Sequence, residues 1–245
     1  MGFKNIVSRI VDRADIVIEV LDARFPEITR NMELEGKIKA GGKKLVLVLN
    51  KSDLVGKKTM KKTKKELGKI APCVFVSASK KHGIRRLREA IGKAAGEKNA
   101  KVALVGIPNS GKSSLLNALK GKTAAKVAPI AGYTKGEQWV RISKKILLLD
   151  SPGVLPMEKA DELTAAITGA KNAEQMEDVE GTALLLLKFL KKEHPEMLEK
   201  KGLKGKGEEM LEQIAVEKGK LLKKGKPNTV EAAKLVLREW QRGNF

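Results

Sequence analysis

Aromatic residues, cysteine and long apolar runs are scarce in this sequence of 245 residues. Phe, Trp and Tyr make up 3% of the chain, there is one cysteine, and no apolar run exceeds five residues. The short runs exclude a membrane-spanning helix and the core of a signal peptide, and a lone cysteine cannot close an internal disulfide. We therefore expect a cytoplasmic protein with no membrane partner and with Cys73 as a buried thiol, and we expect it to be a monomer.

Acidic residues are few in comparison with basic ones. The 50 Lys and Arg residues outnumber the 29 Asp and Glu residues, which gives a net charge of +21. The excess lies in residues 51–100, with 15 basic against 4 acidic residues, and in residues 101–156, with 9 against 2. This charge predicts a polyanionic partner, because Lys and Arg gain affinity by releasing counterions from phosphates. With few aromatic side chains for base stacking, we expect recognition of the backbone and shape of a folded RNA.

Short runs rich in Val, Ile and Leu predict an α/β domain over residues 1–156. Polar or helical stretches separate the runs, which is typical of a mostly parallel sheet with helices on both faces. Apolar residues at helical spacing from Phe3 to Val11 predict an N-terminal amphipathic helix. The predicted strands are 15–21, 45–49, 73–76 and 102–105, followed by an antiparallel hairpin of 139–142 and 146–149.

The pattern changes after Pro156, where the strand signals end and the charges nearly balance. We expect a small all-helical C-terminal domain over residues 157–245, as a second candidate contact with RNA. In its last helix, Asn228 and Glu231 have the spacing of a capping box, and Gly243 favours a left-handed stop. Helical patterns cover residues 184–190, 210–216 and 230–240.

A phosphate-binding pattern, G-x-x-x-x-G-K-S, occupies Gly106–Ser113 between a predicted strand and a helical stretch. In this pattern, backbone N–H groups wrap the β-phosphate and the helix N-terminus adds positive potential. We expect Lys112 to reach the β- and γ-oxygens as a catalytic residue, and the Ser113 hydroxyl to ligate Mg²⁺. The further expected phosphate contacts are Asn109, Ser110, Gly111 and Ser114.

Asn50-Lys51-Ser52-Asp53 directly follows a predicted strand, at the point where open α/β sheets bind ligands. The Asp53 carboxylate is suited to accept both the N1–H and the N2–H₂ of guanine, which adenine cannot offer. We expect Asn50 to tie loops together and the Lys51 stem to cover the base. Ser77-Ala78-Ser79 also follows a strand, and we expect it to complete the pocket, with the Ala78 N–H donating to guanine O6.

Three segments match the pattern D-x-x-G, at Asp53–Gly56, Asp150–Gly153 and Asp178–Gly181, so the pattern alone decides nothing. Position favours Asp150, which ends a predicted strand downstream of the phosphate loop. There we expect Asp150 to hold Mg²⁺ through a water, and Gly153 to donate its N–H to the γ-phosphate as a catalytic contact. Thr134 is the expected catalytic switch residue with its hydroxyl on Mg²⁺, and an ordinary turn threonine is the alternative.

These motifs stand in an unusual order, because the base-binding motifs precede the phosphate loop, Thr134 and Asp150–Gly153. In this order, and in Asp22-Ala23-Arg24-Phe25-Pro26, residues 1 to about 156 resemble the circularly permuted GTPases of the YlqF/YawG type, also called RbgA-like. The resemblance implies a circularly permuted P-loop GTPase fold and hydrolysis of GTP to GDP and phosphate. It also implies a switch that binds ribosomal RNA or the large ribosomal subunit during assembly of that subunit.

Two positions bear on the rate of hydrolysis. Val154 stands where many GTPases carry a water-orienting Gln, and the N-terminal His of bacterial relatives is lacking, since the first histidine is His82. The resemblance thus implies slow hydrolysis that a ribosomal partner stimulates. Asn109 matches an asparagine that helps to hold K⁺ in similar GTPases. The alternatives are a GTP-gated RNA-binding scaffold with negligible hydrolysis and an ATP-using P-loop enzyme, against which Asp53 argues.

The resemblance assigns RNA binding to the C-terminal domain, whereas basic residues concentrate ahead of the phosphate loop. Charge therefore selects the RNA-binding candidates. They are Lys57, Lys58, Lys61, Lys62, Lys64, Lys65, Lys80, Lys81, Arg85, Arg86 and Arg88.

Overall fold

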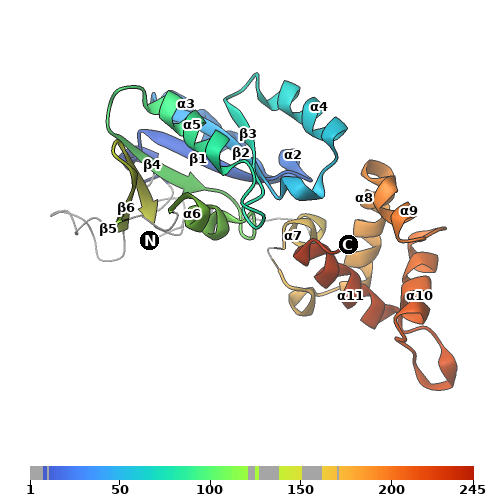
Figure 1. Cartoon of the computed structure of the whole chain (residues 1–245). Helices are drawn as coiled ribbons and strands as arrows, with labels where there is room; N and C mark the ends of the chain where they lie inside the picture. Colours follow the sequence, from blue (N-terminus) through green and yellow to red (C-terminus); the bar gives the residue numbers. More distant parts are fainter. Residues whose placement is uncertain (1–7, 10, 121–124, 127–137, 151–161, 170) are drawn as a thin grey trace. The chain divides into compact units, whose positions relative to one another are not determined.

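The chain forms two compact units, Met1–Pro156 and Met157–Phe245. The computed structural model describes residues 8–9, 11–120, 125–126, 138–150, 162–169 and 171–245 (Figure 1). The predicted N-terminal helix lies partly outside these residues, and its described part, Ser8, Arg9 and residues 11–13, is helical. Within the described ranges, no helix has the length and apolar character needed to cross a membrane.

A seven-stranded sheet forms the centre of the first unit, with the order β3-β2-β1-β4-β7-β6-β5. β1 pairs in parallel with β2 and β4, β2 with β3, and β4 with β7. β6 runs antiparallel to β5 and β7, so the predicted hairpin is confirmed, as is the mostly parallel α/β sheet. The strands are β1 (Ile16–Asp22), β2 (Lys44–Asn50), β3 (Cys73–Phe75), β4 (Ala100–Val105), β5 (Ala125–Lys126), β6 (Gln138–Ser143) and β7 (Ile146–Asp150).

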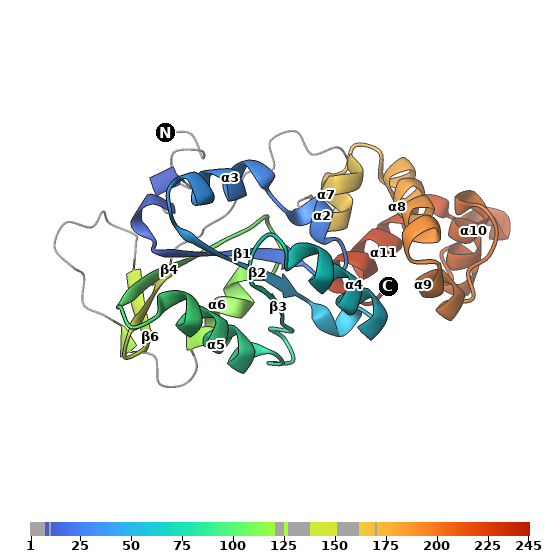
Figure 2. The ribbon, with the colours of Figure 1, turned by 90° about the horizontal axis from the view of Figure 1, so that it is seen from above.

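Helices cover both faces of this sheet, with α3 on one face and α5 and α6 on the other (Figure 2). Ile18 of β1 packs with Leu87 of α5 and Leu115 of α6, whereas Leu21 points the opposite way and packs with Leu67 of α4. Burial on both faces explains why the central strands are almost continuously apolar. The helices are α2 (Pro26–Thr29), α3 (Met32–Ala40), α4 (Lys57–Leu67), α5 (Ile84–Ala95) and α6 (Lys112–Lys120), with a 3₁₀ turn, η1 (Ser52–Leu54).

Cys73 differs from the prediction of a buried thiol. It begins β3, a short strand at the edge of the sheet that pairs with β2, and its side chain is half-buried. An edge strand has a neighbour on one side, which leaves part of the side chain uncovered. Burial still raises the pKa of the Cys73 thiol to about 11, so the thiolate is disfavoured at neutral pH.

The second unit is helical in the residues that the structure describes. Trp240 is fully buried, and its indole N–H donates to the Ile167 carbonyl at 3.1 Å, which joins the last helix to α7. Half of the predicted capping box is confirmed, since the Asn228 side chain accepts the Glu231 N–H at 3.1 Å, and Gly243 ends the helix with φ +79° as predicted. The other half does not form, because the Asn228 N–H donates to the Lys220 carbonyl and the Glu231 carboxylate pairs with Lys234. The elements are α7 (Glu162–Thr168), η2 (Ala173–Gln175), α8 (Val179–Glu193), α9 (Pro195–Lys200), α10 (Gly207–Glu217), η3 (Lys223–Gly225) and α11 (Thr229–Arg242).

Candidate nucleotide-binding site

The carboxyl ends of β2, β3 and β4 bring three loops to one edge of the sheet. The three strands run in the same direction, since β2 pairs in parallel with β3 and with β1, which pairs in parallel with β4. Their loops contain Asn50–Asp53, Ser77–Ser79 and Gly106–Ser113 respectively. The sequence motifs for a base and for phosphates thus share the edge where parallel sheets bind ligands.

The loop after β4 has the form of an anion cradle. A Cβ atom on Gly106 would lie 2.6 Å from the Val20 carbonyl oxygen, and one on Gly111 would lie 2.1 Å from Nδ2 of Asn50. Gly111 also has φ +91°, which residues with a side chain rarely adopt. The Ser110 hydroxyl donates to the Ile107 carbonyl at 3.0 Å and so holds the loop closed ahead of the N-terminus of α6. This arrangement suits a phosphate group.

Lys112 begins α6 and lies across the loop. Its ammonium donates to the Ile107 carbonyl at 2.6 Å, and burial lowers the pKa of its side chain to about 8. Desolvation destabilises the charged form here because the Ile107 carbonyl is a weaker partner than bulk water or an anion. A phosphate at this position would supply the missing negative charge.

The structure describes only some of the other predicted phosphate and metal ligands. Ser110 is buried, whereas the side chains of Asn109, Ser113 and Ser114 are exposed. Asp150 ends β7, a strand that pairs with β4, so its backbone lies at the same edge of the sheet. The Asp150 side chain and the whole of Thr134, Gly153 and Val154 lie outside the described residues. The hydroxyl and carboxylate oxygens of this set are donors that Mg²⁺ prefers.

Asn50 connects all three loops. Its side chain is 3% exposed, its Nδ2 donates to the Ser110 carbonyl at 2.9 Å, and its Oδ1 accepts the Ala78 N–H at 3.0 Å. The Ala78 N–H, predicted as a donor to guanine O6, is therefore bonded to Asn50 in this structure. The reason is that a buried amide needs partners for both its oxygen and its nitrogen. Around this bridge, Ser77 is buried, and Asp53 and Ser79 are exposed.

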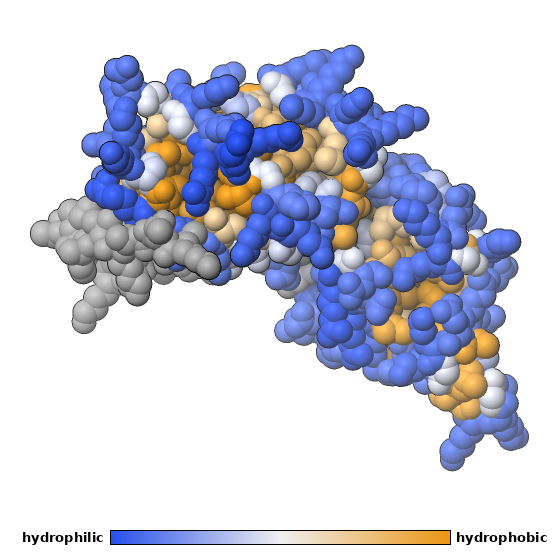
Figure 3. Space-filling view, in the orientation of Figure 1, coloured by the Kyte–Doolittle hydropathy of each residue, from blue (hydrophilic) through white to orange (hydrophobic). Residues whose placement is uncertain are grey.

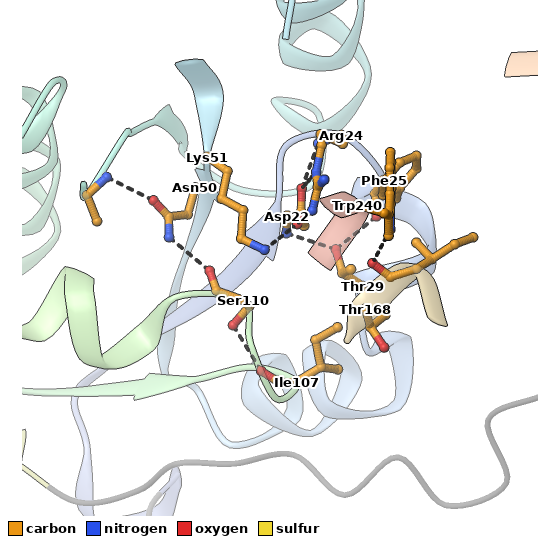
Figure 4. Close-up of polar contacts among 12 residues, drawn as sticks. Asp22, Arg24, Phe25, Thr29, Asn50, Lys51, Ile107, Ser110, Thr168 and Trp240 are labelled. Atoms are coloured by element: carbon orange, nitrogen blue, oxygen red, sulfur yellow. Dashed lines mark hydrogen bonds and ion pairs between the residues drawn. The ribbon is translucent and has the colours of Figure 1, made fainter. Parts of the chain in front are cut away.

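Lys51 has a partner that the sequence motifs do not predict. Its ammonium pairs with Asp22 Oδ2 at 2.9 Å, and the Arg24 guanidinium binds the same carboxylate through Nε and Nη2 (Figure 4). Burial of the Asp22 carboxylate raises its pKa, but Arg24 and Lys51 outweigh that effect and hold the pKa below its ordinary value. The available sequence signal was the acidic residue that directly follows a buried strand.

The predicted RNA-binding side chains form an exposed basic surface on the first unit, and hydrophilic side chains project there over α4 and α5 (Figure 3). Across the residues that the structure describes, none of the six lysines of α4 forms an ion pair. On α5, Arg85 pairs with Glu89, and Arg88 donates to the Leu119 carbonyl at 2.7 Å. The cations of α4 are thus more available to a polyanion than these two arginines.

The structure also accounts for one of the three D-x-x-G matches. Asp178 caps α8, because its Oδ1 accepts the Gly181 N–H at 2.8 Å. Such a cap satisfies a backbone donor at a helix N-terminus, which gives this pattern a purely structural role. Asp178–Gly181 also belongs to the second unit, whereas the phosphate loop belongs to the first.

The fold and the site together define a P-loop nucleotide-binding protein whose base motifs precede its phosphate motif. A family model described as RsgA GTPase matches residues 4–160, and one described as 50S ribosome-binding GTPase matches residues 101–220. The solved structure of GNP-bound YlqF from T. maritima is 26% identical, with a TM-score of 0.71, and covers 98% of this chain and 94% of that one. The chain belongs to the circularly permuted GTPases of the YlqF type.

Curated relatives match nearly the whole chain. An uncharacterized GTP-binding protein of Methanocaldococcus jannaschii is 44% identical over 248 residues, which cover 99% of this chain and 65% of that protein. Nucleolar GTP-binding protein 2 of Schizosaccharomyces pombe is 34% identical, and the match covers 98% of this chain and 47% of that protein. The chain therefore spans about two thirds of the archaeal relative and about half of the fungal one.

Proposed function

We propose that the protein binds GTP, hydrolyses it to GDP and phosphate, and acts as an RNA-binding switch in assembly of the large ribosomal subunit. The single observation that carries the nucleotide site is the Asn50 bridge, which joins the loop with base-binding chemistry to the phosphate loop through Ser110. A base and a phosphate chain bound at the two loops would belong to one ligand. The family model described as 50S ribosome-binding GTPase and the relative named nucleolar GTP-binding protein 2 support the ribosomal role.

In this proposal, the phosphates occupy the cradle of Gly106–Ser113. Lys112 exchanges its bond to the Ile107 carbonyl for the β- and γ-oxygens, and the N–H groups at the start of α6 bind the remaining oxygens. Ser113, Thr134 and Asp150, the last through a water, would hold Mg²⁺, which neutralises negative charge on the phosphates when bound. Asn109 would help to hold K⁺ beside them, and Gly153 would donate its N–H to the γ-phosphate.

The choice of guanine rests on Asp53. Its exposed carboxylate offers two acceptor oxygens, which match the N1–H and N2–H₂ donors of guanine and no pair of donors on adenine. Asn50, Ala78 and the two serines of Ser77–Ser79 form the structural frame beside it. A competition experiment, in which GTP displaces a fluorescent GDP analogue and ATP does not, tests this choice, and equal displacement by ATP would favour an ATP-using enzyme.

Slow hydrolysis by the isolated protein follows from Val154, whose side chain cannot orient a water. We propose that a ribosomal partner completes the catalytic site. The test is multiple-turnover GTP hydrolysis in K⁺ and Na⁺ buffers, with and without large ribosomal subunits from a matched source. Stimulation by subunits supports the switch, and intact GTP binding without stimulation supports a GTP-gated scaffold that scarcely hydrolyses GTP. Equal rates of GTP hydrolysis in K⁺ and Na⁺ buffers would contradict the proposal that Asn109 helps to hold K⁺.

The RNA-binding surface in this proposal is α4. Its lysines are exposed and without ion pairs among the described residues, so little has to be broken before they meet phosphates. The basic residues of 80–88 extend the surface along the chain. In the second unit, residues 218–226 carry five exposed lysines on a turn held by the Leu221–Pro227 bridge. This local charge makes the helical unit a second candidate contact, although its overall charge is nearly balanced.

Neutralising Lys61, Lys62, Lys64 and Lys65 as glutamines tests the α4 surface. The expected result is weaker binding to ribosomal RNA and a smaller salt dependence, by about one unit of log–log slope for each lost phosphate contact. A matched control replaces Lys39, Lys98, Lys144 and Lys145, which are also exposed, form no ion pair among the described residues and remove the same charge elsewhere. Equal effects of the two sets would mean that total charge, and not α4, governs binding. The cytoplasmic location and the monomeric state stay predictions.

A further inference from the structure

Both carboxylate oxygens of Asp22 have partners at this edge of the sheet. Asp22 ends β1, is 3% exposed, and receives hydrogen bonds from the Arg24 backbone N–H and Nε on Oδ1, each at 3.0 Å. Arg24 Nη2 and the Lys51 ammonium both contact Oδ2, at 2.8 and 2.9 Å. One negative charge therefore holds two cations in a place that water scarcely reaches.

Arg24 contacts Asp22 from the same loop, whereas Lys51 contacts it from the loop of the neighbouring strand. Arg24 is two residues away, so it fixes the carboxylate locally and with two-point geometry. Lys51 comes from the loop after the neighbouring strand β2 and brings its ammonium across to β1. Without Asp22, the Arg24 and Lys51 cations would lie close together with no anion between them, and the ammonium of Lys51 would turn away.

The backbone at Lys51 is already fixed by other contacts. Lys51 has φ +60°, an uncommon conformation for a residue with a side chain, and it lies between the Asn50 bridge and the Ser52 N–H, which donates to the Val76 carbonyl at 3.1 Å. What these contacts leave undetermined is the direction of the long Lys51 side chain. The Asp22 ion pair supplies that direction (Figure 4).

We propose that Asp22 is a positioning residue for guanine-nucleotide binding: it anchors the Lys51 ammonium so that the Lys51 stem forms a fixed wall of the base pocket. Arg24 in turn orients Asp22. This inference rests on the proposed function of the Asn50–Asp53 loop. It adds that part of the base pocket is organised from β1, through a side chain that has no contact with the nucleotide in the proposed binding mode.

A double-mutant cycle tests the inference. The variants are Asp22→Asn, Lys51→Met and the two combined, and the measured quantities are the dissociation constants for GDP and for inorganic tripolyphosphate. We expect Asp22→Asn to weaken GDP binding by about tenfold, the size typical of coupled side chains in contact. We expect no further loss when it is added to Lys51→Met. Tripolyphosphate binding, which reports on the phosphate loop alone, should stay unchanged.

Four outcomes would overturn the positioning role of Asp22, and they are distinct from a failure of the proposed function of the Asn50–Asp53 loop. If Lys51→Met leaves GDP binding unchanged, the anchored ammonium contributes nothing and the positioning role fails, whereas the proposed function of the loop, which rests on Asp53, is tested separately by the competition between GTP and ATP. If Lys51→Met weakens GDP binding but Asp22→Asn does not, the positioning role fails. It also fails if Asp22→Asn weakens GDP binding by the same factor in the natural chain and in the Lys51→Met variant. If Asp22→Asn weakens tripolyphosphate binding as well, the residue acts on the fold in general and the inference is overturned. Should Asp22→Asn not fold, Asp22→Glu keeps the charge, displaces it by one methylene, and is held to the same four outcomes.

Discussion

Asn50 donates a hydrogen bond to the carbonyl of Ser110, a residue 60 positions further along the chain, at 2.9 Å. The same amide accepts from Ala78, so one buried side chain sets the spacing of three loops. Circular permutation has placed the base motif ahead of the phosphate motif in sequence, and the parallel sheet brings the two together in space. The Asn50 amide then links the three loops directly.

Replacing Asn50 is expected to loosen both halves of the site. Asn50→Ala leaves the buried Ala78 N–H and the Ser110 carbonyl without partners, so we expect a loss of about 1–3 kcal/mol in the free energy of unfolding. GDP and tripolyphosphate should both bind more weakly, because the phosphate loop loses a support. Asn50→Asp is the informative companion, since it keeps the acceptor for Ala78 and loses the donor to Ser110. Urea unfolding and calorimetric titration measure the two effects, and unchanged tripolyphosphate binding in Asn50→Ala would contradict the expectation.

Lys112 is expected to take up a proton when a nucleotide binds. Burial lowers the pKa of its ammonium to about 8 in the free protein, so the side chain is about half neutral at that pH. A bound phosphate favours the charged form and raises the pKa, so binding at about pH 8 should absorb about half a proton, and affinity should fall as the pH rises further. GDP titration calorimetry in two buffers with different protonation enthalpies measures the uptake. A binding enthalpy that is the same in both buffers would refute it.

Much of the sheet and of the phosphate loop could be predicted from local patterns. The runs that became β1, β2 and β4 are apolar because both faces are covered, and the glycine-lysine pattern occurs where strand and helix meet. By contrast, α3 was not predicted, since its sequence Met32–Ala40 has two buried aliphatic residues, Leu34 and Ile38, and a glycine in the middle. Its burial depends on the neighbouring strands, which periodicity within the segment does not reveal.

The contacts of the site were harder to predict than its residues. The Lys51–Asp22 ion pair joins two neighbouring strands, and the Ala78 N–H is bonded to the Asn50 amide, and both facts depend on the register of the sheet. A motif identifies which residue types face a ligand. It does not determine which of their polar atoms the protein itself already uses, because those partners come from distant segments.

Glu19 is expected to make stability depend on pH. It lies fully buried in β1, one oxygen accepts the Asn31 N–H at 2.7 Å, and the other has no hydrogen-bond partner among the described residues. Burial, with a smaller contribution from the nearby Glu35, raises the pKa of its carboxyl to about 8, although the hydrogen bond from the Asn31 N–H and, more weakly, Arg30 act in the other direction. The folded protein thus keeps a proton that the unfolded chain loses above about pH 4.5, so this group lowers stability as the pH rises from there towards 8.

Glu19→Gln removes that titration and keeps an acceptor for Asn31. We expect the variant to gain stability over the natural chain by about 3 kcal/mol at pH 8 relative to the difference at pH 5, because the unfolded chain releases the Glu19 proton over this range and the folded protein retains it. Urea unfolding at the two pH values measures the change. A stability difference that is the same at both pH values would show that folding does not raise the pKa of Glu19.

The lysines of α4 are expected to work against the stability of their own helix at one end and for it at the other. α4 begins with Lys57 and Lys58, has no side-chain cap at Gly56, and carries Lys64 and Lys65 in its last turn. Positive charge opposes the helix dipole at the N-terminus and complements it at the C-terminus. Replacing the first pair by glutamate should therefore raise the free energy of unfolding, by about 0.3–1 kcal/mol for each side chain, and replacing the second pair should lower it.

Binding to RNA should respond in the same direction to both changes, because each pair replacement removes the same charge from one exposed surface. The two pairs are thus matched controls for each other: stability changes sign between them, while RNA affinity falls in both. Thermal unfolding and filter binding at two salt concentrations provide the two measurements. If RNA affinity followed stability instead, rising with the N-terminal pair and falling with the C-terminal pair, the integrity of the helix and not its charge would govern binding.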